Sequence, residues 1–294
     1  MIDLHTHTNH SDGTDSVEEL LLNAEKKKLD IISITDHDSV DAYYELENNP
    51  NLRKLFSGKI LPGCEMKTHY KKVPIEVLAY GIDYKKLNIH KADIDKMQID
   101  VLEKYKVICD ELGLKYDKEE LYVDKNNPKK QWASFSLANE LLKYEENKEI
   151  IKEIGDFIPT TFYRVHQSNV NSPFYYDETV ASIDLNETIK RIHEAGGLAF
   201  LAHGFVYPYE NKIEVLDEIL KTTEIDGLEC VYTLFSKEET KIAFDLCKKY
   251  NKYSSGGSDY HAKNKPTVEL GIGESNIIVT KDIIKEWLDE SKLM

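Results

Sequence analysis

The sequence predicts a protein of the α/β class with a parallel sheet or barrel, and two observations lead to this prediction. Short β-like runs alternate with helical patterns over residues 1–90 and again over residues 185–294. Such alternation is typical of parallel strands joined by helices. The chain has 294 residues, of which 41% are hydrophobic, and this is enough for a substantial core in one or two domains.

The first part of the chain begins with a short apolar strand at residues 2–4 and continues into a helix. A capping box of Ser16 and Glu19, in which each side chain bonds the other's backbone amide, predicts where the helix starts. An apolar stripe follows at helical spacing. The further elements expected in this part are a buried strand, a helix and two strands, at residues 30–35, 40–47, 60–61 and 75–80.

The pattern changes near residue 90. Residues 91–144 are rich in lysine and glutamate and have helical spacing, with one apolar face formed by Val101, Leu102, Tyr105 and Ile108. Residues 125–128 indicate a break, and residues 157–176 contain two prolines without a clean period, which indicates a loop. We therefore predict a mainly helical insertion at 91–184, covering the substrate, within an α/β domain formed by 1–90 and 185–294.

Strand and helix patterns alternate again after residue 185. A helix at residues 188–195 is expected to end at Gly196 and Gly197, because glycine is common just after a helix. A second capping box, Ser236 with Glu239, predicts a helix that reaches about Tyr250. The other elements expected here are a strand, a helix and a strand, at residues 198–202, 213–222 and 227–231.

The charge balance excludes some classes of protein. There are 38 basic and 53 acidic residues, a formal net charge of −15, and an acidic surface repels a nucleic-acid backbone. We therefore expect no long nucleic acid as a partner, and we expect no obligate protein partner. No apolar run approaches the roughly 20 residues of a membrane span, and no signal peptide is visible. The four cysteines are widely spaced, which favours reduced thiols and a cytoplasmic location.

Histidine and acidic residues recur where the predicted strands end. His5 and His7 are two apart in a strand, so both side chains point to one side and can share a metal ion. Barrels and open α/β sheets carry their active sites at the carboxyl ends of strands. Imidazole and carboxylate ligands without thiolate suit zinc, manganese or iron. The other residues in such places are Asp12, His37, Glu65, His203, Asp259 and His261.

These segments resemble, in the same order, the motifs of the PHP (polymerase and histidinol phosphatase) family. They are His5-Thr6-His7-Thr8 with Ser11-Asp12-Gly13, Ile34-Thr35-Asp36-His37-Asp38, Gly63-Cys64-Glu65, Leu201-Ala202-His203, and Gly257-Ser258-Asp259-Tyr260-His261. They are most similar to the stand-alone metal-dependent phosphoesterase branch, over residues 1–90 and about 185–294. The resemblance implies a distorted (β/α)7 barrel of the PHP type, with two or three divalent metal ions at its C-terminal face.

The resemblance also implies how the ligands are divided among the ions. The first ion would be held by His5, His7, Glu65 and Asp259. Glu65 would bridge to a second ion on His203, and a third would be held by Asp12, His37 and His261. Manganese, iron or zinc are the expected ions, and magnesium is a further option. A hydroxide bound to the metals would attack the phosphorus atom of the substrate.

Two segments depart from the pattern of the family. Where its phosphoesterases usually have a further histidine ligand, this chain has Glu76, which either ligates through its carboxylate, favouring manganese, iron or magnesium, or leaves the second site weak or empty. No arginine follows His203, where a basic residue is usual. Arg164 and His166 in the insertion are the candidates for gripping a phosphate, with an ordinary loop role as the alternative for each.

Together these observations predict a hydrolase that acts on phosphoric ester bonds. The resemblance favours phosphomonoesters or terminal phosphodiesters of small substrates of nucleotide type, including short oligonucleotides. The acidic surface also favours a small substrate over a long polymer. The alternatives are a histidinol-phosphate phosphatase and a non-catalytic metal-binding module of the same family.

Overall fold

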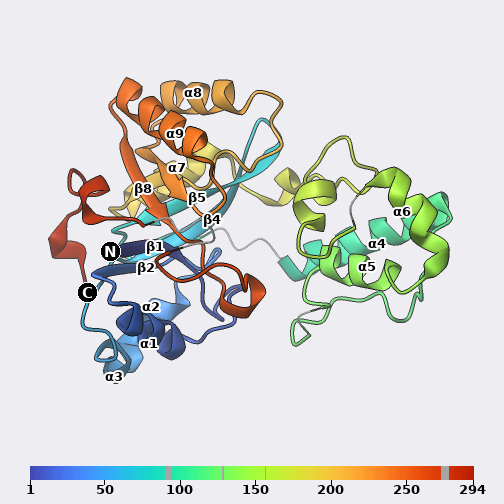
Figure 1. The fold of residues 1–294 in the computed structure, drawn as a ribbon, viewed down its shortest axis with the longest axis horizontal. Coiled ribbons are helices and arrows are strands. Elements are labelled where there is room, and N and C mark those ends of the chain that lie inside the picture. Colours follow the sequence, from blue (N-terminus) through green and yellow to red (C-terminus); the bar gives the residue numbers. More distant parts are fainter. Residues whose placement is uncertain (90–93, 128, 156, 273–277) are drawn as a thin grey trace. The chain divides into compact units, whose positions relative to one another are not determined.

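The strands belong to two sheets, one formed by the first part of the chain alone and the other by its first and last parts together (Figure 1). In this computed structural model, the described residues are 1–89, 94–127, 129–155, 157–272 and 278–294. One sheet has the order β1-β2-β3 and is parallel; the other has the order β4-β5-β6-β7-β8. The strands are β1 Ile2–Thr6, β2 Ile31–Ile34, β3 Lys59–Ile60, β4 Gly63–Tyr70, β5 Val73–Tyr80, β6 Leu198–Leu201, β7 Gly227–Tyr232 and β8 Tyr253–Gly257.

The α/β class is confirmed, but the prediction of a distorted (β/α)7 barrel is not. Within the second sheet, β5 runs antiparallel to both β4 and β6, so the sheet is mixed rather than parallel. Isolated bridges connect the two sheets, Thr6 with Tyr260 on one side and His37 with Glu65 on the other. Glu65 therefore does not end a strand, as the sequence suggested, but is the third residue of β4.

A tight hairpin between β4 and β5 explains this difference. Its two turn residues, Lys71 and Lys72, have φ of 49° and 64°, the left-handed conformation that a two-residue hairpin turn requires. Asparagine and glycine are the usual residues in such turns. Because two lysines carry no such signal, the hairpin is not predictable from the residues of its turn.

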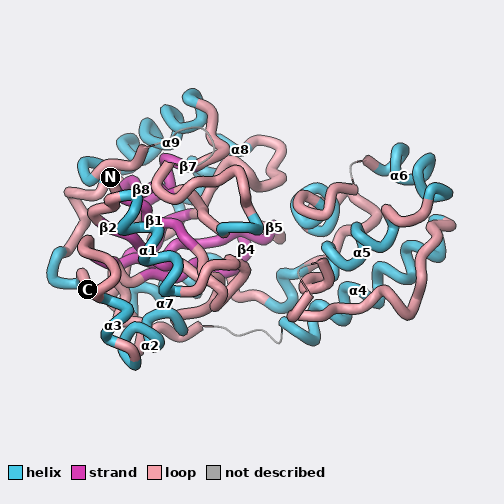
Figure 2. Tube along the Cα trace, turned by 60° about the horizontal axis from the view of Figure 1, so that its bottom comes forward, coloured by secondary structure: helices cyan, strands magenta, loops and turns pink. Residues whose placement is uncertain are grey.

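The boundary between the two compact units of the chain lies near residue 90, where the sequence pattern changes. The chain forms two compact units, one of Met1–His90 with Ile183–Met294 and the other of Lys91–Ser182. In the first unit the strands lie in the interior and the helices around them (Figure 2). The helices of this unit are α1 Val17–Lys27, α2 Asp41–Asn48, α3 Pro50–Arg53, α7 Leu185–Glu194, α8 Lys212–Thr222 and α9 Lys237–Tyr250.

Local capping signals place several of these helices as the sequence predicts. Both capping boxes form, Ser16 with Glu19 at the start of α1 and Ser236 with Glu239 at the start of α9. Each contributes about 1 kcal/mol to helix stability. Helix α7 begins three residues earlier than predicted, because the Asp184 carboxylate accepts hydrogen bonds from the amides of the first turn.

The second unit is built around aromatic and aliphatic side chains. Its helices are α4 Ile94–Leu112, α5 Ala133–Leu141 and α6 Lys148–Ile154. The apolar face predicted on α4 is buried. The segment expected as a loop contains one π-helical turn, Tyr163–Gln167, because Phe162 within this segment packs edge-to-face on Phe157 and Phe174. Pro128, in the predicted break, lies outside the described residues. Among the described helices, none has the length and apolar character needed to cross a bilayer.

Candidate metal centre

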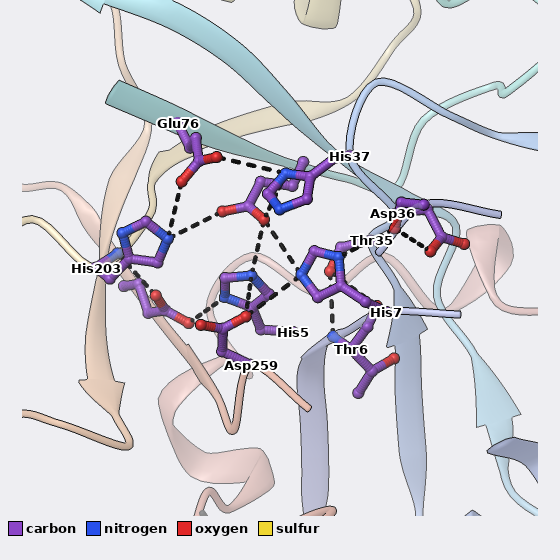
Figure 3. A network of polar contacts seen from close by, with 12 residues as sticks. His5, Thr6, His7, Thr35, Asp36, His37, Glu76, His203 and Asp259 are labelled. Carbon is purple, nitrogen blue, oxygen red and sulfur yellow. Dashed lines mark hydrogen bonds and ion pairs between the residues drawn. The ribbon is translucent and has the colours of Figure 1, made fainter. Parts of the chain in front are cut away.

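Nine histidine and acidic side chains from distant parts of the first unit converge, three from within strands β1, β4 and β5 and six from segments that follow strands. Figure 3 shows several of them, reaching toward one another from β1, β5 and the segments after β2, β6 and β8. The nine are those that the sequence analysis proposed as metal ligands: His5, His7, Asp12, His37, Glu65, Glu76, His203, Asp259 and His261.

Glu65 lies at the middle of this group. Its Oε2 is 3.1 Å from His5 Nε2, 3.2 Å from His7 Nε2 and 3.2 Å from His37 Nδ1, and its Oε1 is 3.1 Å from His203 Nε2. The side chain is fully enclosed. One buried carboxylate thus faces four imidazoles, three at one oxygen and one at the other.

Close backbone approaches bring these ligands into place. Strand β8 comes so near to β1 that a Cβ on Gly257 would lie 2.4 Å from the backbone nitrogen of His5. A Cβ on Gly13 would lie 2.5 Å from the His7 carbonyl oxygen. Only glycine fits at both positions. The two glycines therefore let β8 and the loop that carries Asp12 approach the segment from His5 to His7.

Asp36 fixes the loop that carries Asp12. Its carboxylate accepts hydrogen bonds from the backbone nitrogen and hydroxyl of Thr8, both at 2.7 Å, and from the Ser11 hydroxyl at 2.6 Å. The loop then places Asp12 Oδ1 at 3.0 Å from His261 Nε2 and Asp12 Oδ2 at 3.7 Å from His37 Nε2. The predicted third group is therefore brought together, with His7 added to it.

Asp259 presents its two oxygens to different surroundings. Oδ1 lies 3.5 Å from His5 Nε2, 3.4 Å from His7 Nε2 and 3.3 Å from His261 Nδ1. Oδ2 accepts hydrogen bonds from the Tyr232 hydroxyl at 2.8 Å and from Lys265 Nζ at 2.5 Å. One oxygen thus faces the histidines while two donors hold the other.

Glu76 is placed at the outer side of the group. Its Oε1 is 3.4 Å from His37 Nδ1 and its Oε2 is 3.3 Å from His203 Nε2. The Glu76 backbone N–H donates to the Tyr207 hydroxyl at 2.8 Å, which holds this part of β5. The side chains of Glu76, His37 and Asp12 are 21%, 17% and 25% exposed, whereas the other six are buried. The centre therefore meets solvent on the side of these three residues.

Mutual charge stabilises the ionised forms of these buried groups. Burial alone would lower the pKa of His7 and His203, but Asp259 and Glu65 near the first, and Glu65 and Glu76 near the second, raise both values to about 9. Burial alone would raise the pKa of Glu65, but the surrounding histidines, His5 foremost, hold it well below its usual range. The centre is thus built for carboxylates that stay charged.

The donor set fits divalent metal ions. In four overlapping groups the ligand atoms all lie within 4.8 Å of one another. These groups are His7, Asp12, His37 and His261; His5, His7 and Glu65; His5, His203 and Asp259; and His37, Glu65 and Glu76. His7 Nε2, His37 Nδ1 and Asp12 Oδ1 are buried without a well-formed hydrogen bond to any described residue. A bound ion would satisfy such atoms, and nitrogen with carboxylate oxygen suits zinc, manganese or iron.

The two substrate-binding candidates lie in the second unit. Arg164 is exposed, in the π-helical turn. His166 is buried against Phe157 and Phe162, with Nδ1 3.0 Å from the Ser172 hydroxyl. That a phosphate is bound by these two residues stays a prediction.

Sequence reasoning did not predict the contacts that three polar residues make with the candidate ligands. They are Glu229, Tyr232 and Lys265, which contact His5 or Asp259. Only Glu229 left a usable signal, as an acidic residue in an apolar strand, Gly227–Tyr232. The other two are ordinary residue types whose contacts depend on the fold.

Known proteins are similar to this chain in sequence or in fold. A 5'-3' exoribonuclease of Haemophilus influenzae (strain ATCC 51907 / DSM 11121 / KW20 / Rd) is 24% identical over 287 residues, 97% of each chain. An amidohydrolase structure from Chromobacterium violaceum superposes with a TM-score of 0.70 at 18% identity, covering 100% of this chain and 97% of that one.

A further solved structure has the same fold, and a family profile covers more than half of the chain. A protein named as a metal-dependent phosphoesterase, from Bifidobacterium adolescentis, has a TM-score of 0.66 at 22% identity, covering 98% of this chain and 96% of that one. The profile of the PHP domain matches residues 3–164, which include six of the nine converging side chains. This chain belongs to the PHP domain family.

Proposed function

We propose that this protein is a metal-dependent phosphoesterase, a hydrolase that acts on phosphomonoesters or terminal phosphodiesters of small, nucleotide-type substrates. The observation that carries the proposal is Glu65, a buried carboxylate that faces four imidazoles within 3.2 Å. The name of the exoribonuclease relative supports a substrate of nucleotide type. The two bridged sheets would act as halves of one distorted barrel with the centre at its mouth.

Different residues of the chain would bind the metal ions and hold their ligands in place. His5, His7 and Asp259 would hold one ion, with Glu65 shared between two. Bound divalent ions supply a nucleophile at neutral pH and neutralise charge on the phosphoryl oxygens. Lys265 keeps the Asp259 carboxylate ionised, and Asp36 holds the loop of Asp12 in place. The exposed edge at Glu76 and His37 would admit the phosphate.

An assay of purified protein tests this function. The protein would be incubated with Mn²⁺ and a panel of p-nitrophenyl phosphate, nucleoside bisphosphates, short 5'-phosphorylated RNA oligonucleotides and histidinol phosphate. We expect phosphate or nucleotide release from the nucleotide-type substrates, and its loss on chelation. Glu65→Gln protein purified by the same procedure controls for contaminating phosphatases. Preferred turnover of histidinol phosphate would contradict the substrate class, and tight metal retention without turnover would indicate a non-catalytic module.

The metal preference of the centre is expected to depend on Glu76. Carboxylate oxygen favours manganese or magnesium, whereas imidazole favours zinc. We expect Glu76→His to raise the ratio of zinc- to manganese-supported activity by about tenfold, and Glu76→Ala to lower the number of ions per chain. Activity with each ion and elemental analysis measure both effects. An unchanged ratio together with an unchanged ion count would show that Glu76 is not a ligand.

Arg164 is proposed to bind the phosphate of the substrate from the second unit. A charge-assisted hydrogen bond to phosphate contributes about 1.5–3 kcal/mol. We therefore expect Arg164→Ala to lower kcat/KM about tenfold or more, and Arg164→Lys to restore part of it. Lys129→Ala removes an exposed cation of the same unit and serves as the control. Kinetics of Arg164→Ala equal to those of the control would leave Arg164 as an ordinary surface residue.

A further inference from the structure

Glu229 lies next to the metal centre without being one of its nine ligand candidates. It is the third residue of β7 and its side chain is buried. Its Oε1 lies 2.9 Å from His5 Nδ1, and its Oε2 accepts the backbone N–H of His203 at 2.8 Å. Each oxygen of this carboxylate therefore contacts a different candidate ligand.

The contact with His5 determines which ring nitrogen is left for a metal ion. A carboxylate bound to one nitrogen of an imidazole keeps the proton there and fixes the orientation of the ring. With Nδ1 bound to Glu229, the nitrogen facing the centre is Nε2, 3.1 Å from Glu65 Oε2. Without Glu229, either nitrogen of His5 would be able to carry the proton.

The contact with His203 acts on the backbone. His203 has φ of 27°, in the left-handed region that residues with a side chain rarely adopt. This bend directs Nε2 to 3.1 Å from Glu65 Oε1 and 3.3 Å from Glu76 Oε2. The hydrogen bond that the His203 backbone N–H donates to Glu229 stabilises this left-handed conformation.

We propose that Glu229 is a positioning residue of the metal centre, one carboxylate that orients the His5 ring and holds the His203 backbone at the same time. The inference rests on the proposed metal-dependent function. It also explains the residue type, since two donors approach the side chain and only a carboxylate offers an acceptor to each. In Glu229→Gln, the amide nitrogen would face either the His5 N–H or the His203 N–H.

Metal affinity is the direct test of this role. Glu229→Gln and Glu229→Asp would be loaded with Co²⁺, and the affinity measured by competition with a chelator and the coordination by visible absorption. Loss of a carboxylate behind a metal-bound histidine typically weakens binding about 10- to 100-fold. We expect a loss of this size in Glu229→Gln, and also in Glu229→Asp because its carboxylate, one methylene shorter, would not reach both His5 and His203, with an altered absorption spectrum in each variant. Glu140→Gln changes an equally buried carboxylate in the other unit and is expected to behave as wild type.

The outcomes separate this inference from the proposed function. Wild-type protein that binds no divalent ion would overturn both. Wild-type binding with unchanged affinity and absorption in both Glu229 variants would overturn the positioning role alone. Failure of both variants to fold, judged by circular dichroism, would also overturn it, because it would make Glu229 a requirement of the fold rather than of the centre.

Discussion

Glu65→Gln is expected to lower the rate of phosphoester hydrolysis at least about a thousandfold and to reduce the metal content of the purified protein. Loss of one preorganised electrostatic contact alone costs about 10²–10³ in rate. Glu65 is the candidate ligand shared between two ions, since it faces three histidines at Oε2 and His203 at Oε1, so its loss is expected to affect more than one such contact. Either orientation of the glutamine would place an amide NH₂ against imidazole nitrogens, so the bridging arrangement is lost.

Steady-state kinetics with Mn²⁺ and elemental analysis measure this effect. Glu140→Gln removes a buried carboxylate from the second unit and is expected to retain the full rate and metal content. Thermal unfolding of metal-free protein shows whether each variant folds. A folded Glu65→Gln protein with undiminished turnover would exclude the centre as the site of catalysis.

Asp259→Asn is expected to have an effect of similar size for a different reason. The oxygen at the Oδ2 position accepts hydrogen bonds from Tyr232 and Lys265. In the variant, the amide oxygen would stay with these two donors, which turns the amide nitrogen toward the histidines. An amide nitrogen is no ligand for a divalent ion, so we expect loss of metal and a rate about a thousandfold lower.

A smaller effect on metal binding is expected from a change at Lys265, which donates a hydrogen bond to Asp259. Burial raises the pKa of Asp259, but Lys265, with His5 and His261, holds it well below its usual range. We expect Lys265→Met to weaken metal binding about tenfold, most strongly at low pH, where Asp259 would begin to take up a proton. Lys263→Met changes an exposed neighbour and is the matched control. Equal metal affinity of the two lysine variants across pH 5–8 would contradict this role for Lys265.

Much of the first unit could be predicted because its signals are local. Capping boxes at Ser16 and Ser236 depend on residues three apart, and both helices start where these boxes predict. The HxH spacing of His5 and His7 likewise follows from the two-residue period of a strand. Signals of this kind need no knowledge of the rest of the chain.

The hairpin of β4 and β5 shows where local reasoning fails. Lys71 and Lys72 adopt left-handed conformations without the residue types that usually mark them. The pairing along both eight-residue strands, rather than the turn itself, stabilises the hairpin. As a result Glu65 and Glu76 come from paired antiparallel strands, and the sheet is mixed.

The sequence by itself determined the residue types of the candidate ligands, imidazoles and carboxylates in the order of the PHP motifs, and the caps of the helices. Tertiary structure alone decided which groups surround these ligands. Glu229 reaches His5 across 224 residues of sequence, and Tyr232 and Lys265 meet on one oxygen of Asp259. Ligand type is a property of each side chain, whereas the hydrogen bonds that orient a ligand depend on strands β1, β7 and β8 lying side by side.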